Sequence, residues 1–196
     1  MSLEIRAAES QCDIDACRAL MLAYAQWLEN ESCLSGFAGE MAGLPGKYAP
    51  PDGELLIAII GGEPAGCIAF RKFDEGVAEG KRLWVRPQFR RHGVGVALLH
   101  RMVAGAKAAG YERVVFDTLP RMADALRLYG SLGFEPAEAY YESALPGVMF
   151  FKIDFTPNSP SRHGTSSLSR LRPEPFPPGN ENLSMEIDEI VYGDRR

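Results

Sequence analysis

The pattern of apolar and polar residues predicts a mixture of strands and helices over the first 155 positions. Apolar residues spaced three or four apart between Ala16 and Leu28 predict an amphipathic helix, and Ser10 with Asp13 three positions later is typical of a helix start. Apolar runs on both sides of Gly61-Gly62 predict a hairpin. Strands are expected at 3–6, 55–60, 65–70, 77–85, 114–118, 137–142 and 148–154, and further helices within 30–51, from 94 to near 110, and at 122–132.

The composition changes after residue 155. Residues 156–182 are dominated by Pro, Ser, Arg and Asn and hold almost no large apolar side chain. Such a segment buries too little surface to offset its chain entropy, so we expect disorder there. We therefore divide the chain into one folded domain, 1–155, and a tail, 156–196. The spaced apolar residues at 183–192 either dock on a subunit or belong to a loose end.

Composition and charge narrow the class of protein. Of the 196 residues, 46% are hydrophobic, which supports one full core, and the net charge of −5 argues against a general nucleic-acid binder. No apolar run approaches the roughly 20 residues that cross a bilayer, and no N-terminal stretch is typical of a signal peptide. We expect a cytoplasmic protein with no membrane partner. The cysteines and histidines lack metal-binding spacing, so no metal is expected.

One glycine-rich loop carries the strongest functional signal. The sequence Arg90-Arg91-His92-Gly93-Val94-Gly95 follows an apolar strand and opens a helical pattern. Glycines at such a turn let a phosphate approach the main chain, where the first helical N–H groups and the positive end of the helix dipole converge. The chain lacks the Gly-Lys-Ser/Thr of a Walker loop and the third glycine of a dinucleotide fingerprint, since Leu98 stands there. We expect a phosphate-bearing cofactor of another kind.

Two motifs in the expected order carry a family resemblance. The pattern Arg-x-x-Gly-x-Gly, with Leu126-Arg127-Leu128-Tyr129 and Gly133-Phe134 downstream, resembles the acetyl-CoA signature and the following helix of the GNAT superfamily of N-acetyltransferases. The resemblance implies an α/β (α+β) fold. In that fold a mixed, mostly antiparallel sheet of six to seven strands is flanked by about four helices, and the fourth and fifth strands splay apart. Residues 44–51 and 117–120 also resemble a bacterial subgroup whose substrates are mostly unassigned.

The resemblance makes acetyl-CoA the expected co-substrate. The main-chain N–H groups of residues 93–96 would hold its pyrophosphate, and the fourth strand would bind the pantetheine arm through main-chain groups, as an added strand does. The side chains of Arg90 and Arg91 either add phosphate contacts or point to solvent. The expected cofactor-binding residues are Leu83, Val85, Arg90, Arg91, His92, Gly93, Val94, Gly95 and Val96.

Glu79 is the expected catalytic base. An alkylammonium with a pKa near 10 must lose a proton before it can attack a thioester, and the resemblance places a base at this position. Strand alternation predicts that Glu79 shares one face with Lys81, Leu83 and Val85. In the alternative reading Glu79 is a solvated carboxylate paired with a neighbouring cation. Asp117, at the end of the next strand, is the weaker candidate.

Tyr129 is the expected catalytic acid. It matches the tyrosine that members of the resembled family aim at the CoA sulfur, and a phenol can protonate a leaving thiolate. The alternative is an aromatic core residue on the helix at 122–132. The chain departs from the family at Met122, where many members carry an asparagine that bonds CoA, so that contact is expected to be lost or replaced by a main-chain group.

The expected reaction is direct transfer of an acetyl group to a primary amine of a small molecule through a tetrahedral intermediate. The alternatives are a protein Nα-amine or lysine as acceptor and, in another class, a non-catalytic acyl-CoA sensor. The acceptor pocket is expected between residues 27–51 and Tyr140-Tyr141, and acidic side chains there are candidates to attract a cationic amine: Glu29, Glu31 and Glu40. A homodimer is suggested only by the habit of the family.

Overall fold

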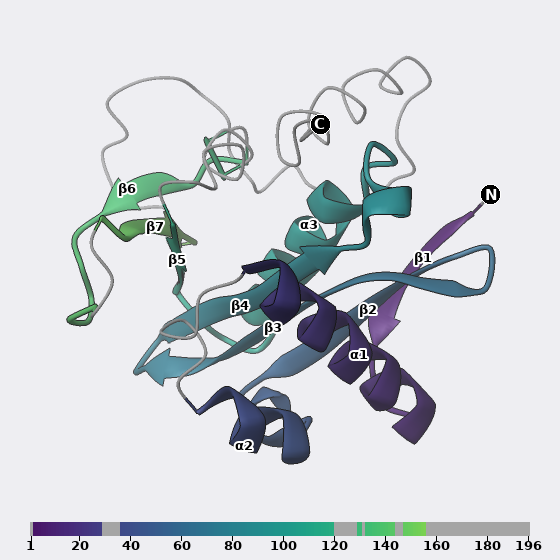
Figure 1. The fold of residues 1–196 in the computed structure, drawn as a ribbon. Coiled ribbons are helices and arrows are strands. Elements are labelled where there is room, and N and C mark those ends of the chain that lie inside the picture. The colour runs from purple at the N-terminus through teal and green to yellow at the C-terminus, as the bar shows by residue number, and fades with distance from the viewer. Residues whose placement is uncertain (1, 29–35, 120–128, 131, 144–146, 156–196) are drawn as a thin grey trace.

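A mixed seven-stranded sheet runs through the molecule, with α1 and α2 on one face and α3 on the other (Figure 1). The structure is a computed structural model, and it describes residues 2–28, 36–119, 129–130, 132–143 and 147–155. The strand order is β1-β2-β3-β4-β5-β7-β6. The strands are β1 (Leu3–Ala7), β2 (Glu54–Ile60), β3 (Glu63–Asp74), β4 (Val77–Val85), β5 (Arg113–Thr118), β6 (Glu135–Ala137) and β7 (Met149–Asp154). The helices are α1 (Gln11–Leu28), α2 (Phe37–Ala42) and α3 (Val94–Ala108), with short 3₁₀ turns at Gly46–Tyr48 and Pro87–Phe89.

The local signals at the start of the chain are confirmed. The Asp13 N–H donates to Ser10 Oγ at 3.1 Å, so Ser10 caps the start of α1. The Asp13 carboxylate accepts a hydrogen bond from Arg6 Nη2 at 2.6 Å, which connects α1 to β1. At the predicted hairpin, Gly61 and Gly62 have φ of 59° and 87°. Two successive positive φ values suit the tight turn that joins β2 to β3.

Alternate residues of the strands fill two separate cores, one on each face. The face covered by α3 buries Leu56, Ile68, Phe70 and Phe116 against Leu98, Leu99 and Met102. The face covered by α1 and α2 buries Leu55, Ile57, Cys67 and Trp84 against Leu20, Met21 and Phe37. We refer to these as the α3 face and the α1 face. Successive side chains of a strand point to opposite faces of the sheet, so neighbouring apolar residues of one strand enter different cores.

The β4 and β5 strands pair for only three residues and then part. Their parallel ladder joins Val77 to Arg113, Ala78 to Val114 and Glu79 to Val115. Beyond Glu79, β4 continues to pair with β3 as far as Val85, whereas β5 continues with β7. The expected splay of the fourth and fifth strands is therefore confirmed, and it leaves one edge of residues 80–85 without a neighbouring strand among the described residues.

One predicted strand is wrong. The expected final pair was 137–142 with 148–154, but β6 ends at Ala137, opposite Phe150 of β7. The chain leaves the ladder after Ala137, and the Tyr140 and Tyr141 rings pack on Phe150 with centroids 5.0 and 5.2 Å away. The helix expected at 122–132 and the tail at 156–196 lie mainly or wholly outside the described residues. Over the part of the chain that is described, no helix has the length and apolar character needed to cross a membrane.

Candidate functional site

A charged cluster occupies the α1 face at the point where β4 and β5 part. The Glu79 side chain is only 2% exposed, and Arg71, which lies opposite it on β3, donates from Nε and Nη2 to its Oε2 at 2.8 and 2.6 Å. Lys81 Nζ lies 3.0 Å from the other oxygen, Oε1. A buried carboxylate needs such partners, because an unpaired charge away from water is costly. Glu79 is thus the buried centre of the cluster, paired as the alternative reading expected but not solvated.

The cluster also bridges the gap between the parting strands. Lys81 Nζ contacts Asp117 Oδ1 of β5 at 2.9 Å, two residues beyond the last main-chain pairing on each strand. The Tyr141 hydroxyl donates to Asp117 Oδ2 at 3.1 Å, and the Tyr140 hydroxyl lies 3.4 Å from Glu79 Oε1. Burial, followed by the nearby Asp117 carboxylate, raises the pKa of both phenols, so both hold their protons at neutral pH.

An aromatic group borders the charged cluster. Tyr140 meets Phe73 of β3 and Phe150 of β7 edge-on, with ring centroids 4.9 and 5.0 Å apart. Tyr141 meets both Tyr140 and Phe150 in the same way. Tyr140 and Tyr141 were expected to line an acceptor pocket, and the structure brings them against Glu79 and Asp117. Apolar walls beside a few convergent polar groups are typical of small-molecule sites.

A β-bulge follows this cluster on β4. Arg82 and Leu83 together oppose the single residue Ile68 of β3, and Arg82 has a φ of 63°, in the left-handed region. The extra residue resets the alternation, so Leu83 and Val85 pack on the α3 face, while Glu79 and Lys81 lie on the α1 face. The prediction that these four residues share one face is wrong, because it assumed an unbroken period of two.

Glu40 fixes the side chain of the bulged residue. Arg82 donates from Nε and Nη2 to the two Glu40 oxygens at 2.7 and 3.0 Å, and Lys47 and the Tyr48 hydroxyl contact the same carboxylate. Desolvation opposes ionisation, but the bonds from Arg82 and Lys47 outweigh it and lower the pKa of Glu40 to about 2. Glu40 was a candidate to attract a cationic amine. Its charge is instead used within the protein, and Glu29 and Glu31 lie outside the described residues.

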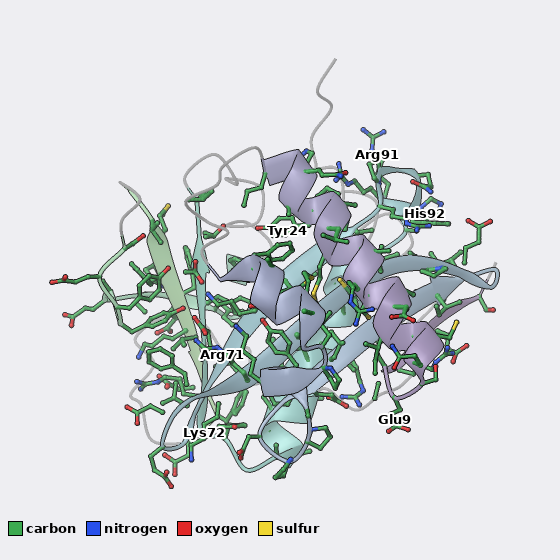
Figure 2. All side chains as sticks on the ribbon, turned by 60° about the horizontal axis from the view of Figure 1, so that its bottom comes forward. Glu9, Tyr24, Arg71, Lys72, Arg91 and His92 are labelled. Carbon is green, nitrogen blue, oxygen red and sulfur yellow. The ribbon has the colours of Figure 1, made fainter. Side chains whose placement is uncertain are left out.

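The glycine-rich loop has the geometry of an anion cradle. Arg91 and Gly93 have φ of 66° and 70°, and α3 begins directly afterwards at Val94. The first main-chain bond from inside the helix is Ala97 N–H to Gly93 O, so the N–H groups of Val94, Gly95 and Val96 lie ahead of the helical ladder. They accompany the positive end of a helix of 15 residues. Figure 2 shows the Arg91 and His92 side chains projecting outward from this loop.

Arg90 braces the loop against β4. Its Nε donates to the Val85 carbonyl at 3.2 Å, and its guanidinium lies 4.9 Å from the centre of the Trp84 ring. The Arg86 N–H bonds to Ala65 of β3, so the preceding Val85 carbonyl points the other way, toward the gap beside β5. Arg90 therefore connects the cradle to the open edge of β4. These contacts do not fit a solvated side chain, and the phosphate contact of Arg90 stays a prediction.

Tyr129 lies in the core of the α3 face. Its ring stacks on Phe116 of β5 with centroids 5.4 Å apart and contacts Phe134 and Phe151 at 5.6 Å. Burial in this apolar surrounding raises the pKa of the Tyr129 phenol, and the nearby Tyr24 and Asp117 raise it further. The residue is an aromatic core residue, as one reading expected. It also carries a phenol that stays protonated at neutral pH, which the acid role requires.

Arg71 is the site residue that sequence reasoning missed. A signal was present, because Arg71 and Glu79 each lie four positions from Glu75, in the turn that joins β3 to β4. Opposite charges facing each other across a hairpin are a common stabilising pair. The pairing of Tyr140 with Glu79 had no such signal, since 61 positions separate the two residues.

Comparisons with known proteins place this arrangement in a family. The Acetyltransferase (GNAT) family model matches residues 23–134. An uncharacterized N-acetyltransferase of Schizosaccharomyces pombe is 32% identical over 157 residues, which cover 79% of this chain and 96% of that protein. The N-acetylaspartate synthetase of Homo sapiens is 30% identical over 125 residues, 59% of this chain but only 41% of that protein.

A solved structure gives the same result for the fold. The PaiA N-acetyltransferase of Thermoplasma acidophilum, in complex with coenzyme A, superposes with a TM-score of 0.62 at 17% identity and covers 79% of this chain and 100% of its own. At that identity the likeness shows the fold alone. The family match spans more than half of the sequence, from α1 past the glycine-rich loop to Phe134. The chain therefore belongs to the Acetyltransferase (GNAT) family, and its enzymatic class is that of an acyltransferase.

Proposed function

We propose that the protein transfers the acetyl group of acetyl-CoA to the primary amine of a small molecule, by direct attack through a tetrahedral intermediate. The observation that carries this proposal is the coincidence of three features at one place. The strands β4 and β5 part after Glu79, the helix α3 begins beside the open edge, and a charged cluster with two phenols lies at the mouth of the gap. The name of the human relative, N-acetylaspartate synthetase, supports a small acceptor.

The loop and β4 fit the co-substrate. The N–H groups of residues 93–96 are proposed to hold the pyrophosphate, with Arg91 and His92 beside them at the surface. The main-chain groups of Leu83 and Val85 at the open edge of β4 are proposed to pair with the pantetheine amides. Bound acetyl-CoA supplies an activated acyl group. What the chain adds is the placement of that group between the two parting strands.

Glu79 is proposed as the base. The acceptor amine arrives as an ammonium and must lose a proton before it can attack. Both Glu79 oxygens are engaged by Arg71, Lys81 and Tyr140, and the side chain is only 2% exposed. The proton is therefore proposed to reach Glu79 through a hydrogen-bonded water rather than by direct contact. Asp117, linked to Glu79 through Lys81, remains the second candidate.

Tyr129 is proposed to protonate the departing CoA thiolate. Burial raises the pKa of the Tyr129 phenol, so the phenol keeps its proton at neutral pH and can donate a hydrogen bond to the sulfur. Negative charge develops on the sulfur only as the C–S bond breaks, and the proton is proposed to pass from the phenol to the sulfur at that point. The phenol is rigidly held, since its ring is packed between Phe116, Phe134 and Phe151. Rigid placement favours catalysis because no reordering is needed in the transition state.

The test is a measurement of CoA thiol release by the purified full chain with acetyl-CoA and a library of amines. Glu79→Gln is expected to lower kcat by about 100-fold or more and Tyr129→Phe by about 10- to 100-fold, the range of general acid–base contributions, with the Kd for CoA unchanged. Matched controls are Glu75→Gln, an exposed carboxylate, and Tyr111→Phe, a buried phenol bonded to the Asp52 carbonyl. Both controls should retain full activity.

Each other result has a distinct meaning. If both site variants keep full activity, the assignment of base and acid is wrong while the reaction stands. If acetyl-CoA binds but no amine releases thiol, the protein acts as an acyl-CoA sensor. If only peptides with a free amine are acetylated, the acceptor is a protein. Absence of acetyl-CoA binding would remove the role of the glycine-rich loop.

A further inference from the structure

The charged cluster on the α1 face is layered, with its cations nearer to solvent than their shared partner. The Glu79 side chain is 2% exposed, whereas those of Arg71 and Lys81 are 31% and 22% exposed. An approaching molecule therefore meets a guanidinium and an ammonium before it meets the buried carboxylate. This order is the reverse of what a site for a bare cation would present.

Arg71 uses only part of its hydrogen-bonding capacity. A guanidinium carries five N–H donors in a planar fork. Arg71 directs Nε and Nη2 at one oxygen of Glu79, and within the described part of the chain Nη1 has no partner. The Nη1–Nη2 edge of the fork is thus left for another acceptor. Two parallel N–H groups at that edge match the two oxygens of a carboxylate.

The other pole of the cluster is an anion. Asp117 is 26% exposed and is held by Lys81 Nζ at 2.9 Å and by the Tyr141 hydroxyl at 3.1 Å. Two cations, Arg71 and Lys81, balance the two anions, Glu79 and Asp117, so the cluster is neutral as a whole. A neutral cluster with separated poles complements a molecule that carries both charges better than it complements a simple amine or a phosphate dianion.

We propose that Arg71 binds a carboxylate of the acceptor, so that the preferred acceptors are primary amines that also carry a carboxylate, as amino acids do. The Nη1–Nη2 edge of Arg71 receives the carboxylate, while the ammonium lies toward Asp117 and the hydrogen-bonded path to Glu79. This assignment rests on the acetyl transfer proposed above and names the class of its acceptor. Arg71 is a binding and positioning residue here, and takes no part in bond breaking.

The first experiment compares matched acceptors with the wild-type full chain. Each common α-amino acid is assayed beside its carboxamide and its decarboxylated amine, and kcat/KM is measured from thiol release. The carboxylated member of at least one set is expected to exceed both others by about 10- to 100-fold, the value of one charge-assisted, two-point contact. Amine reactivity does not explain such a preference, because the carboxamide has the less basic amine and holds more free base at neutral pH.

Variants of Arg71 then assign the preference to this side chain. Arg71→Gln is expected to raise KM for the carboxylated acceptor by about 10- to 100-fold while changing KM for its carboxamide and for acetyl-CoA by less than about threefold. Arg71→Lys keeps the positive charge beside Glu79 but lacks the planar fork, so it tests the preference in a protein that keeps the charge balance. Arg71→Lys should also reduce the ratio of kcat/KM for the carboxylated acceptor to kcat/KM for its carboxamide.

Lys72 provides the matched control. It is the next residue of β3 and bonds to Glu75 in the β3–β4 turn, and Figure 2 shows it apart from Arg71. Lys72→Gln removes one positive charge from the same strand and should leave every acceptor ratio unchanged. Thermal unfolding of each variant is measured in parallel. A variant that has generally lost structure should show a lower unfolding temperature and a lower kcat/KM for every acceptor.

The failure of this inference differs from the failure of the proposed function. If wild-type protein uses neutral amines as well as carboxylated ones, or if the Arg71 variants weaken both equally, the inference is overturned and the acetyl transfer stands. If no amine releases thiol, the acetyl transfer fails. In that case binding is measured by calorimetry with the amino acids themselves, and binding that is equal in wild type and Arg71→Gln overturns the inference as well.

Discussion

Arg82 combines a left-handed main chain with a buried, paired side chain. A residue other than glycine at a φ of 63° is strained by contact of its Cβ with the carbonyl that follows. Two bonds to Glu40 offset that strain, and the guanidinium also lies 5.1 Å from the centre of the Phe37 ring. Both Glu40 and Phe37 belong to α2. One residue thus holds the bulge of β4 and anchors α2 at the same time.

Glu40→Gln should remove the contribution of Glu40 to the pH dependence of the unfolding free energy. The pKa of Glu40 is about 2 in the native state and about 4.5 when unfolded, so its stabilisation is complete above pH 4.5 and disappears as the pH falls toward 2. We expect the difference in unfolding free energy between wild type and Glu40→Gln to be about 2 kcal/mol smaller at pH 3 than at pH 7. Urea denaturation at the two pH values measures it.

The control for this experiment is Glu75→Gln, whose carboxylate is 94% exposed and pairs with Lys72. An exposed pair contributes little, so this variant should follow the wild type at both pH values. Equal behaviour of Glu40→Gln and Glu75→Gln would show that the Glu40 pair does not stabilise the protein.

Sequence reasoning at the residue scale succeeds for local features and fails for distant contacts. The Ser10 cap and the Gly61-Gly62 turn were predicted because each depends on residues within a few positions. The bulge at Arg82 depends on Glu40, which is 42 positions away, and no local pattern announces it. A single extra residue then reversed the faces assigned to Leu83 and Val85. The choice of Glu79 as the base had used that shared face as one argument and the family resemblance as the other.

At the scale of elements, the cradle is made of main chain rather than of side chains. The turn before α3 places Gly93 at a φ of 70°, and the three residues that follow are buried in the core. The Val94 and Val96 side chains pack in the core of the α3 face and fix the helix against the sheet, while the N–H groups of all three residues lie at its N-terminal end. The strand β4 contributes in the same way, through the groups of its unpaired edge. Side-chain identity therefore says little about cofactor contacts here.

Gly93→Ala should weaken cofactor binding more than it weakens the fold. An alanine at this φ costs about 1 kcal/mol, and shifting the first N–H groups of α3 should raise the Kd for CoA by about tenfold. Calorimetric titration with CoA and urea denaturation measure the two effects. Gly62→Ala is the control, because Gly62 has a φ of 87° and an added Cβ there meets nothing within 4 Å. It should show the same loss of stability with an unchanged Kd.

A fall in CoA affinity of the same size in Gly62→Ala would mean that the effect comes from general loss of stability, and the cradle would lose its support. An unchanged Kd in Gly93→Ala would contradict the placement of pyrophosphate at this loop.

The order of strands and helices was predictable at this scale because apolar periodicity is local. The exception was the strand expected at 137–142, where two tyrosine rings turn onto β7 instead.

The seven-stranded sheet that runs through the molecule consists of two portions joined at one narrow seam. Three pairs between β4 and β5 connect β1–β4 to β5–β7–β6, and the ion pair of Lys81 with Asp117 spans the opening just beyond them. The proposed chemistry lies at this seam because a free strand edge and side chains from both portions meet there. The composition of the sequence predicts one domain, whereas the place of the seam follows from strand register, which composition does not encode.

Removal of residues 156–196 should leave the domain folded and able to bind CoA. The last described main-chain contact joins Phe155 N–H to the Glu112 carbonyl at 2.8 Å, directly after β7 ends at Asp154. A chain ending at Phe155 is expected to keep its unfolding free energy within about 0.5 kcal/mol and its Kd for CoA unchanged. A chain ending at Lys152 also loses Ile153, which is only 4% exposed, and should be less stable by about 2 to 5 kcal/mol. If the chain ending at Phe155 is destabilised to a similar extent, the apolar residues at 183–192 dock on the domain.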